Sequence, residues 1–219
     1  TGVTVQGSSL EGKRVILAVS GGIAATESIK LARELRRHGA AVFPMMSKSA
    51  EGVISPLALS WGSGVEVITK WDPEMSQLDD FDGLILAPAT RNSISKFTHG
   101  ILDSPMMMAL SAASGQRIPM LFVPSMHNDL FHDAVTTDLL SSLDELGVKV
   151  LLEEPSEGRR KQPSATKIVA QYCNMTNSRL ERRKRVVVTL GGNVAQIDSV
   201  RRIVNASTGK TGWAIAEHL

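Results

Sequence analysis

The chain has 219 residues, which suits one α/β domain with an appendage. Hydrophobic residues make up 42% of it, enough for a packed core, and the net charge of +2 is too small to indicate binding to nucleic acid or to an anionic membrane. No stretch approaches the ~20 apolar residues that cross a bilayer. Cys173 is the only cysteine, which excludes an internal disulfide and a cysteine-based zinc site, so we expect no metal and a reducing, cytoplasmic location.

Residues 1–12 are polar and rich in glycine and serine, so we expect a flexible arm rather than a signal peptide. Residues 14–19 are apolar and β-branched, which predicts a strand buried on both faces. Apolar residues then recur at helical spacing, which predicts a helix that ends at His38-Gly39. The side chains expected on its buried face are Ile23, Ile29, Leu31, Ala32 and Leu35.

The same alternation of strand and helix continues along the chain. Further strands are predicted at residues 41–46, 65–68, 83–87, 119–123 and 148–152. Helices are predicted from residue 49, over 93–114, over 139–146 and over 164–175. This alternation is typical of an α/β fold with a doubly wound, Rossmann-like parallel sheet, whose ligands bind at the carboxyl ends of the strands.

The composition changes towards the end of the chain. Residues 153–163 are charged and carry two prolines and a glycine, which indicates a surface loop or flap. The basic segment 179–185 is expected to be a solvated linker rather than a phosphate-binding element. An apolar run at 186–190 precedes a second Gly-Gly, so we predict that residues 13–178 form one domain and that 186–219 begin a second α/β domain.

The turn Ser20-Gly21-Gly22-Ile23, between a predicted strand and a predicted helix, is the first candidate binding site. Glycines let the backbone approach a ligand closely, and a helix N-terminus offers free N–H groups to a phosphate. The same residues also suit a tight turn without a ligand. The spacing is neither that of a dinucleotide site nor that of a Walker loop, so a mononucleotide is the better interpretation.

Three further motifs follow predicted strands. Ser47 and Ser49 either bind a phosphate or cap the next helix, and capping is the preferred interpretation for Ser49. Small residues around Ala87 and Thr90 leave room for a flat ring, whereas Met126 is either part of the core or a polarizable neighbour of such a ring. Because the carboxyl ends of parallel strands meet, we expect all four motifs at one edge of the sheet.

These motifs carry a resemblance to a known family. The segments "VILAVSGGIAATESIKLARELRRHGA", "MSKSA", "DGLILAPAT" and "PMLFVPSMHNDL" resemble the homo-oligomeric flavin-containing cysteine decarboxylases, in particular phosphopantothenoylcysteine decarboxylase. The segment "VVVTLGGNVAQIDSVRRIVNASTGKTGWAIAEHL" resembles the start of phosphopantothenate–cysteine ligase. The two follow one another in the bifunctional enzymes of coenzyme A biosynthesis, and the resemblance covers residues 12–219. The Gly-Gly turn and the ligase-like tail weigh against a related prenyl-flavin-making transferase.

The resemblance implies FMN as the cofactor and a phosphorylated small molecule, 4′-phospho-N-pantothenoylcysteine, as the substrate that is decarboxylated to 4′-phosphopantetheine. In the implied reaction the flavin takes a hydride equivalent from the cysteine moiety, carbon dioxide leaves, and the reduced flavin returns its electrons. The implied cofactor-binding residues are Ser20, Gly21, Gly22, Ile23, Ser47, Ala87, Thr90 and Met126. A homo-oligomer is also implied, a trimer or a multiple of trimers, in which the apolar stretch Met106–Leu110 packs around the flavin edge of a neighbour.

The sequence departs from the family at polar positions of the site, which makes three residues the catalytic candidates. Glu74 falls on the family's catalytic His, Asp103 on a substrate-binding Asn, and His127 on the Asn of its "PAMN" motif. A Glu is a weaker base than a His unless burial raises its pKa, and the flap lacks the Cys proton donor that the family often has there. The alternative function is therefore an FMN-binding protein of the same fold with lost or altered catalysis, acting as a scaffold or regulator.

Two residues of the tail match ligase positions. Asn205 and Lys210 fall where the ligase family handles the acyl-nucleotide intermediate and phosphates. Residues 186–219 are too few to form a nucleotide-dependent ligase domain, so we expect no ligase activity from this segment.

Overall fold

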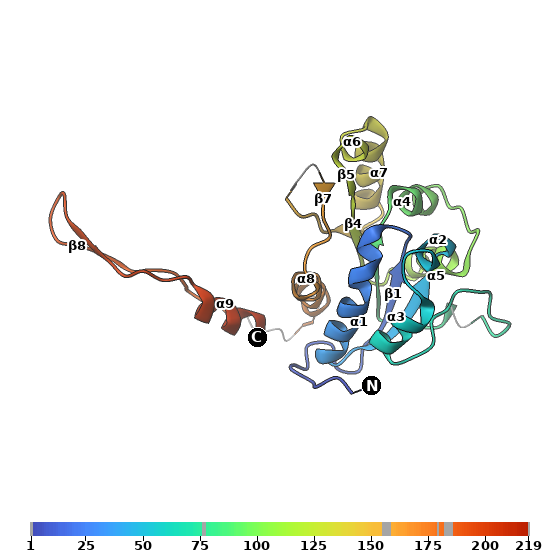
Figure 1. Cartoon of the computed structure of the whole chain (residues 1–219), viewed down its shortest axis with the longest axis horizontal. Helices are drawn as coiled ribbons and strands as arrows, with labels where there is room; N and C mark the ends of the chain where they lie inside the picture. The colour runs from blue at the N-terminus through green and yellow to red at the C-terminus, as the bar shows by residue number, and fades with distance from the viewer. Residues whose placement is uncertain (1, 76–77, 155–158, 179, 182–185, 219) are drawn as a thin grey trace. The chain divides into compact units, whose positions relative to one another are not determined.

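The computed structural model describes residues 2–75, 78–154, 159–178, 180–181 and 186–218. The chain divides into two compact units, Thr1–Asn177 and Ser178–Leu219. In the first unit, helices surround a central sheet (Figure 1).

The central sheet has five parallel strands in the order β2-β1-β3-β4-β6. Its strands are β1 (Arg14–Val19), β2 (Ala41–Met46), β3 (Gly83–Ala89), β4 (Met120–Pro124) and β6 (Lys149–Val150). All of β3 and all but the first residue of β1 are buried, because both faces of the sheet are covered. The predicted doubly wound parallel fold is confirmed.

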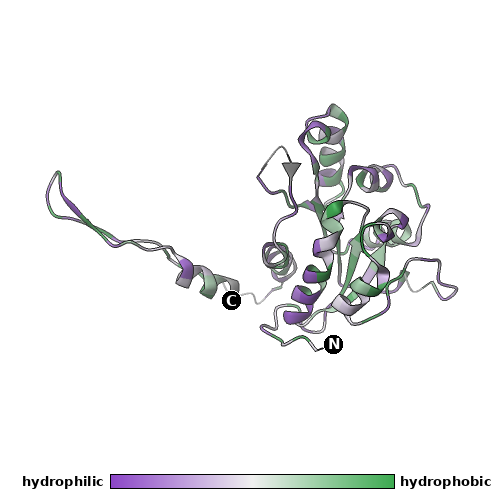
Figure 2. Cartoon of the chain, in the orientation of Figure 1, coloured by the Kyte–Doolittle hydropathy of each residue, from purple (hydrophilic) through white to green (hydrophobic). Residues whose placement is uncertain are grey.

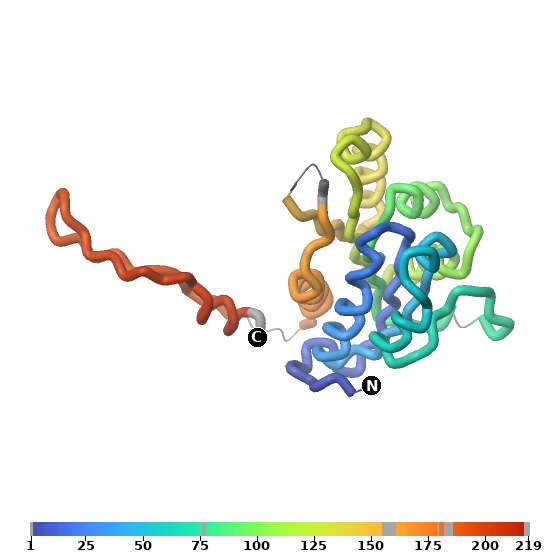
Figure 3. Tube along the Cα trace, in the orientation of Figure 1, coloured from blue at the N-terminus to red at the C-terminus, as the bar shows by residue number. Residues whose placement is uncertain are grey.

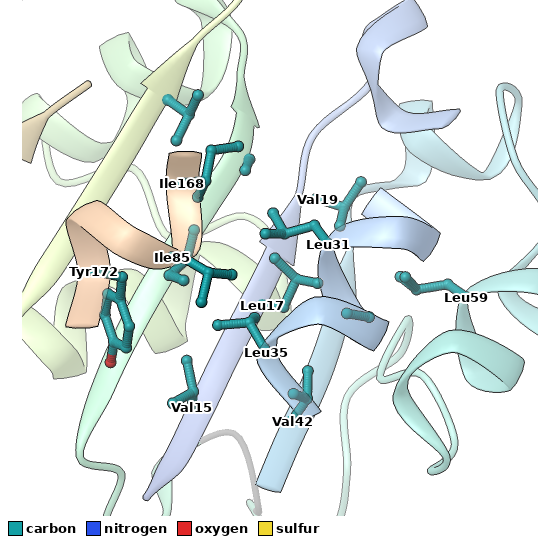
Figure 4. Close-up of a cluster of buried hydrophobic side chains, with 14 of the residues drawn as sticks. Val15, Leu17, Val19, Leu31, Leu35, Val42, Leu59, Ile85, Ile168 and Tyr172 are labelled. Carbon is teal, nitrogen blue, oxygen red and sulfur yellow. The ribbon is translucent and has the colours of Figure 1, made fainter. Parts of the chain in front are cut away.

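Helices cover the two faces of the sheet, and each face has its own core. The helices of this unit are η1 (Ile23–Glu27), α1 (Ser28–Arg37), α2 (Lys48–Glu51), α3 (Pro56–Ser63), α4 (Arg91–Thr98), α5 (Pro105–Gly115), α6 (Asn128–Phe131), α7 (Ala134–Glu145) and α8 (Ala165–Asn177). Alternate side chains of β1 enter opposite cores. Val15, Leu17 and Val19 pack with α1, α3 and α8 (Figure 4), whereas Ile16 and Ala18 pack with α4, α5 and α7. Figure 2 shows the apolar residues of this unit concentrated in the strands.

The order of the strands changes direction next to β1. From β1 the chain moves outward to β2, and it then crosses back to β3 on the other side of β1. At such a point the connections that leave neighbouring strands run to opposite faces, which leaves a crevice for a ligand outside the carboxyl ends. The Gly-Gly turn follows β1 and Thr90 follows β3, so both lie at this crevice.

Two predicted elements form differently. Residues 65–68 make only an isolated bridge to β2 instead of a strand. The helix predicted at 93–114 is divided into α4 and α5. Gly100 follows the end of α4 with a φ of 68°, a conformation that ends helices, and Pro105 suits the first turn of a new helix rather than the interior of an old one.

The helix after the Gly-Gly turn buries most of its predicted face, but its first residue is an exception. Leu31, Ala32 and Leu35 are buried as predicted, whereas Ile23 is 80% exposed. The segment begins as the 3₁₀-helix η1, whose tighter winding does not keep Ile23 in line with the apolar stripe of α1.

The N-terminal arm is packed against the end of α1. The trace of the arm runs beside the C-terminal end of α1 (Figure 3). The N–H groups of Gln6 and Gly7 donate to the carbonyl of Arg37 at 2.8 and 3.2 Å, and Leu10 is fully buried in the same core as α1. The expectation of a flexible arm is therefore wrong for residues 6–10. Leu10 anchors this mostly polar segment, whereas Val5 is 65% exposed, a difference that composition alone does not indicate.

The second unit contains an antiparallel hairpin of β8 (Val194–Gln196) and β9 (Arg202–Val204), followed by α9 (Lys210–His218). The strand predicted at 186–190 does not form. A strand needs hydrogen bonds from a neighbour, and no strand among the described residues pairs with this segment. No helix in the described parts of either unit combines the length and apolar character needed to cross a bilayer.

Gly83, at the start of β3, lies where α8 packs on the sheet and leaves no room for a side chain. A Cβ at this position would overlap the hydroxyl of Tyr172 and lie 3.1 Å from the carbonyl oxygen of Pro119. We predict that Gly83→Ala lowers the free energy of unfolding by about 2 kcal/mol, measured by chemical denaturation, because overpacking strains a core.

The matched control is Gly115→Ala, whose Cβ would meet nothing within 4 Å, and which should leave stability unchanged or slightly raised. Adding Tyr172→Phe to Gly83→Ala removes the overlapping hydroxyl and should recover part of the loss. A Gly83→Ala protein as stable as the starting protein would contradict this account of the β3–α8 contact.

Candidate functional site

Ser20 joins the ends of β1 and β3 at the crevice. Its side chain is fully buried, and its hydroxyl donates to the carbonyl of Pro88 at 2.7 Å while accepting from the N–H of Thr90 at 2.9 Å. The backbone N–H of Ser20 donates to the same carbonyl at 3.3 Å. The turn after β1 and the segment after β3 are therefore fixed relative to one another by one side chain.

Gly21 follows directly and touches the segment after β2. A Cβ on Gly21 would overlap the Ser49 side chain and lie 2.7 Å from its carbonyl carbon, so no other residue fits without displacing the backbone. Gly22 is less restricted, since its Cβ would lie 3.5 Å from a methyl group of Thr90. The close approach of three loops explains Gly21, and the exposed Ile23 lies at the outer end of the turn.

Ser47 and Thr90 are the N-caps of α2 and α4. The Ser47 hydroxyl accepts from the N–H of Ala50 at 3.3 Å and lies 3.1 Å from the hydroxyl of Ser49. The Thr90 hydroxyl accepts from the N–H of Ser93 at 3.4 Å and donates to the hydroxyl of Ser93 at 3.1 Å. The cap of α2 is therefore Ser47, and the preferred interpretation of Ser49 as the cap is wrong. The Ser49 hydroxyl has no capping role.

A cavity of about 480 Å³ opens beside these caps, between the first residues of α2, the face of α4 and the start of α5. Its described lining consists of Ser47, Lys48, Ser49, Asn92, Ser93, Lys96, Asp103, Ser104, Met106 and Met107. The structure therefore brings together two predicted site residues, Ser47 and Asp103, which are far apart in the sequence. Seven of these ten residues carry a hydroxyl, amide or ammonium group, so the cavity offers hydrogen-bond donors to an anion.

Three of the lining residues lie on α4 and were not predicted. Asn92, Ser93 and Lys96 share one face of this helix, at positions that recur with helical spacing after Thr90. Projecting the helix from its cap would have identified them. A lysine and an asparagine on an amphipathic helix otherwise indicate a solvated face, which is why the sequence alone did not single them out.

Asp103 is engaged in an ion pair. Its carboxylate lies 2.5 Å from the Nζ of Lys96, and the two side chains are 48% and 30% exposed. Asp103 lies in the connection that follows Gly100, one residue before Ser104, the N-cap of α5. Asp103, predicted as a catalytic residue, is therefore ion-paired with Lys96 at the cavity wall.

Ala87 and Met126 belong to the core rather than to an open surface. Ala87 is fully buried, and its carbonyl accepts a hydrogen bond from the hydroxyl of Ser28 at 3.0 Å. Met126 is 9% exposed and packs in the core that contains α4, α5 and α7. Of the two alternatives for Met126, the structure shows the core position. Direct contact of Ala87 with a flat ring does not agree with its burial.

His127 lies on a short antiparallel pair beside this edge. β5 (Met126–His127) pairs with β7 (Arg159–Arg160), which belongs to the predicted flap, and His127 opposes Arg159. The His127 side chain is exposed and makes no capping bond to α6. The flap is thus attached to the strand end that carries Met126, although its residues 155–158 lie outside the described part of the chain.

Glu74 does not line the cavity of its own chain. It is exposed in the loop before β3, where its N–H donates to the carboxylate of Asp72 at 2.9 Å. The end of the same loop is tied to the opposite edge of the sheet, where Asp82 accepts a bond from Lys13 at 3.0 Å. Glu74, a catalytic candidate from the sequence, therefore does not lie at this cavity within one chain.

Cys173 adds no reactive thiolate to this edge. Burial on α8 raises the pKa of the Cys173 thiol to about 11, so the thiol stays protonated at neutral pH. Among the described residues, no group of three or more His, Cys, Asp or Glu side chains is placed to hold a metal ion.

The two predicted ligase-like residues lie in the second unit. Asn205 follows β9 directly, and its N–H donates to the carbonyl of Asn193 at 3.0 Å. Lys210 is exposed at the first position of α9. A Cβ on Gly192 would overlap the carbonyl oxygen of Asn205, so this hairpin needs a glycine in the second Gly-Gly.

Solved structures share the fold of the first unit. The FMN-binding protein AtHal3 superimposes with a TM-score of 0.67 at 22% identity, covering 77% of this chain and 99% of the other. A PPC decarboxylase mutant complexed with pantothenoylaminoethenethiol gives a TM-score of 0.63 at 22% identity, with 73% and 96% covered. At this identity the likeness shows the fold alone.

Curated relatives match nearly the whole chain. The coenzyme A biosynthesis bifunctional protein CoaBC of Thermococcus kodakarensis is 36% identical over 215 residues, which are 95% of this chain and 53% of the relative. The proteins of the same name from Methanocaldococcus jannaschii and Bacillus subtilis are 32% and 34% identical, again over 95% of this chain and over 52% and 55% of the relatives. The chain therefore spans about half the length of these relatives.

Two family models divide the chain much as the structure does. The model described as "DNA/pantothenate metabolism flavoprotein C-terminal domain" matches residues 181–219. The model described as "Flavoprotein" matches residues 4–194, well over half of the chain. The chain belongs to the flavoprotein family.

Proposed function

We propose that this chain binds FMN at the carboxyl edge of its sheet and decarboxylates 4′-phospho-N-pantothenoylcysteine in coenzyme A biosynthesis. The observation that carries the proposal is the donor-rich cavity beside Ser47 and Thr90, next to the point where β1 and β3 diverge. Open α/β sheets bind their ligands at this point, and the chain belongs to a flavoprotein family.

The residues present fit the cofactor. FMN carries a phosphate, which needs several N–H and O–H donors, and the cavity wall supplies the hydroxyls of Ser47, Ser49, Ser93 and Ser104. The cavity volume of about 480 Å³ is typical of small-molecule sites. Gly21 brings the backbone of the turn against the Ser49 segment, and Ser49 is part of the same wall.

Relatives and structural neighbours support both the cofactor and the reaction. The relatives are named for coenzyme A biosynthesis, and a neighbour that covers 76% of this chain with a TM-score of 0.68 is an FMN-dependent cysteine decarboxylase, SpaF. When bound, the flavin supplies the oxidation of the cysteine moiety that lets its carboxylate leave as carbon dioxide. The chain's own groups bind and orient: hydroxyls of the cavity hold the phosphate, and the β5–β7 pair holds His127 just after the carboxyl end of β4.

We propose further that the chain works as a homo-oligomer, a trimer or a multiple of trimers. The predicted contact through Met106–Leu110 needs correction, because Met106, Met107 and Leu110 are buried in the core of their own unit. Leu57 and Trp61 provide a better surface, since they are 68% and 63% exposed and lie one turn apart on α3.

An oligomer also offers a role for Glu74. Because Glu74 is exposed and lies outside the cavity of its own chain, it can act on a substrate only at the cavity of a neighbouring copy. Trp71 is 51% exposed in the same loop, which gives the loop an apolar residue for such a contact. We propose Glu74 as the base in this arrangement and His127 as the alternative.

The first prediction is that the purified protein takes up FMN with a stoichiometry of one per chain and releases carbon dioxide from 4′-phospho-N-pantothenoylcysteine. Absorbance titration measures the uptake, and trapped carbon dioxide measures the turnover. Gly21→Leu should abolish uptake, because its side chain would displace the Ser49 segment. A protein that binds FMN but releases no carbon dioxide would support the non-catalytic alternative, and one that binds no FMN would refute the proposal.

The second prediction concerns Glu74. Glu74→Gln keeps the shape of the side chain and removes its basicity, so turnover should fall at least about a hundredfold while FMN stays bound. Co-assembly of Glu74→Gln chains with Gly21→Leu chains should restore part of the activity, because an intact Glu74 then faces an intact cavity. If Glu74→Gln leaves the rate unchanged, His127 becomes the candidate base. If co-assembly restores nothing, Glu74 does not act across an interface.

The third prediction tests the α3 surface. Trp61→Glu should shift the protein from an oligomer to smaller species in light scattering at micromolar concentration, because a carboxylate in an apolar interface is costly to bury. Leu130→Glu is the control, since Leu130 is 44% exposed on α6 and away from α3. A Trp61→Glu protein with unchanged mass would exclude this surface as the contact.

A further inference from the structure

Lys96 differs from the other lysine of the cavity lining. The side chain of Lys48 is 93% exposed and pairs with Glu51 on its own short helix, at 3.2 Å. The side chain of Lys96 is only 30% exposed, on the same face of α4 as Asn92 and Ser93. Partial burial of a lysine ammonium costs free energy unless a negative charge faces it, so Lys96 needs an acidic partner.

Asp103 is that partner. The Asp103 carboxylate lies 2.5 Å from Lys96 Nζ, and the pair connects α4 to the segment that enters α5. Both residues line the cavity, so the pair forms part of its wall rather than an isolated surface bridge. The carboxylate holds the ammonium at the wall, where it also faces the cavity space.

An anion that enters the cavity meets these two charges with opposite effects. The ammonium of Lys96 attracts it, and the carboxylate of Asp103 repels it. The hydroxyls of Ser47, Ser93 and Ser104 add donors that suit the oxygen atoms of a phosphate better than an isolated carboxylate group. A phosphate monoester has the negative charge and the acceptor oxygens to compete with Asp103 for the ammonium group of Lys96.

Building on the proposed function, we infer that Lys96 is the residue that recognises the phosphate monoester of the ligand in this cavity. Asp103 is a positioning residue, which holds the Lys96 ammonium at the cavity wall and lowers the affinity for the phosphate by charge repulsion. This assigns Asp103 a role through Lys96 instead of the catalytic role predicted from the sequence. The phosphate is that of FMN or that of the phosphorylated substrate, and the two sources are separable by ligands that lack it.

The test compares ligands with and without the phosphate. Lys96→Met should weaken FMN binding at least about tenfold at low ionic strength and change riboflavin binding less than about twofold, measured by flavin fluorescence, because a charge-assisted hydrogen bond to phosphate is lost. If the phosphate is the substrate's, FMN binding stays intact, and the preference for 4′-phospho-N-pantothenoylcysteine over N-pantothenoylcysteine in kcat/KM falls instead. Lys96→Arg keeps the charge and should preserve the preference in either case.

Asp103→Asn and a distant control complete the design. Asp103→Asn keeps an acceptor for Lys96 and removes the repulsive charge, so it should tighten binding of the phosphorylated ligand several-fold and leave the unphosphorylated one unchanged. Lys13→Met removes the same charge from an ion pair at the opposite edge of the sheet. It should change the binding of neither the phosphorylated nor the unphosphorylated ligand. Thermal unfolding of each variant verifies that it is folded.

The outcomes separate this inference from the proposed function. A wild-type protein that binds no flavin refutes the proposed function. If the wild type binds FMN and turns over substrate, but Lys96→Met alters neither phosphate preference, Lys96 does not recognise the phosphate and the inference is overturned. Equal losses for ligands with and without the phosphate in Lys96→Met or Asp103→Asn would assign the pair a purely structural role, which also overturns it.

Discussion

The buried hydroxyl of Ser20 is the interaction on which the arrangement of this edge depends. It bonds the N–H of Thr90 and the carbonyl of Pro88 at once, two backbone groups next to the core, and the Pro88 carbonyl also accepts from the N–H of Ser20. Leaving one such buried group unpaired costs about 1–3 kcal/mol. Because Ser20 directly follows β1 and Thr90 caps α4, this bridge sets where the Gly-Gly turn and the face of α4 lie relative to one another, and thereby where the cavity opens.

The parts of the fold that were predictable are those governed by burial on both sides. Residues 14–19 and 83–87 are continuous apolar runs, and they form β1 and β3 because helices cover both faces of the sheet. Prediction failed where one local feature outweighed the pattern. The periodicity of apolar residues predicts one helix across Gly100 and Pro105, but these two residues divide it. The 3₁₀ turn places Ile23 in solvent. Residues 186–190 have strand composition but no neighbour among the described strands.

The candidate site was predictable at its strand ends and less so on its helices. Ser20, Ser47 and Thr90 were found because they lie in motifs that directly follow predicted strands and that resemble the family. Lys96 was missed because a lysine on an amphipathic helix has the same pattern whether it faces solvent or a cavity. Ala87 and Met126 were assigned to a ring-lining surface, yet burial places both in the core. Such distinctions depend on packing between elements that are distant in the sequence, and the periodicity of a single segment gives no information on that packing.

The most direct test of this account is to locate FMN bound to this chain by crystallography. We predict that the cofactor lies outside the carboxyl ends of β1 and β3. Its phosphate should be within hydrogen-bond distance, about 3 Å, of cavity hydroxyls such as Ser47 or Ser93 and beside the backbone of Gly21. Flavin bound elsewhere, with the cavity beside α4 holding only solvent, would contradict the assignment of this edge as the functional site.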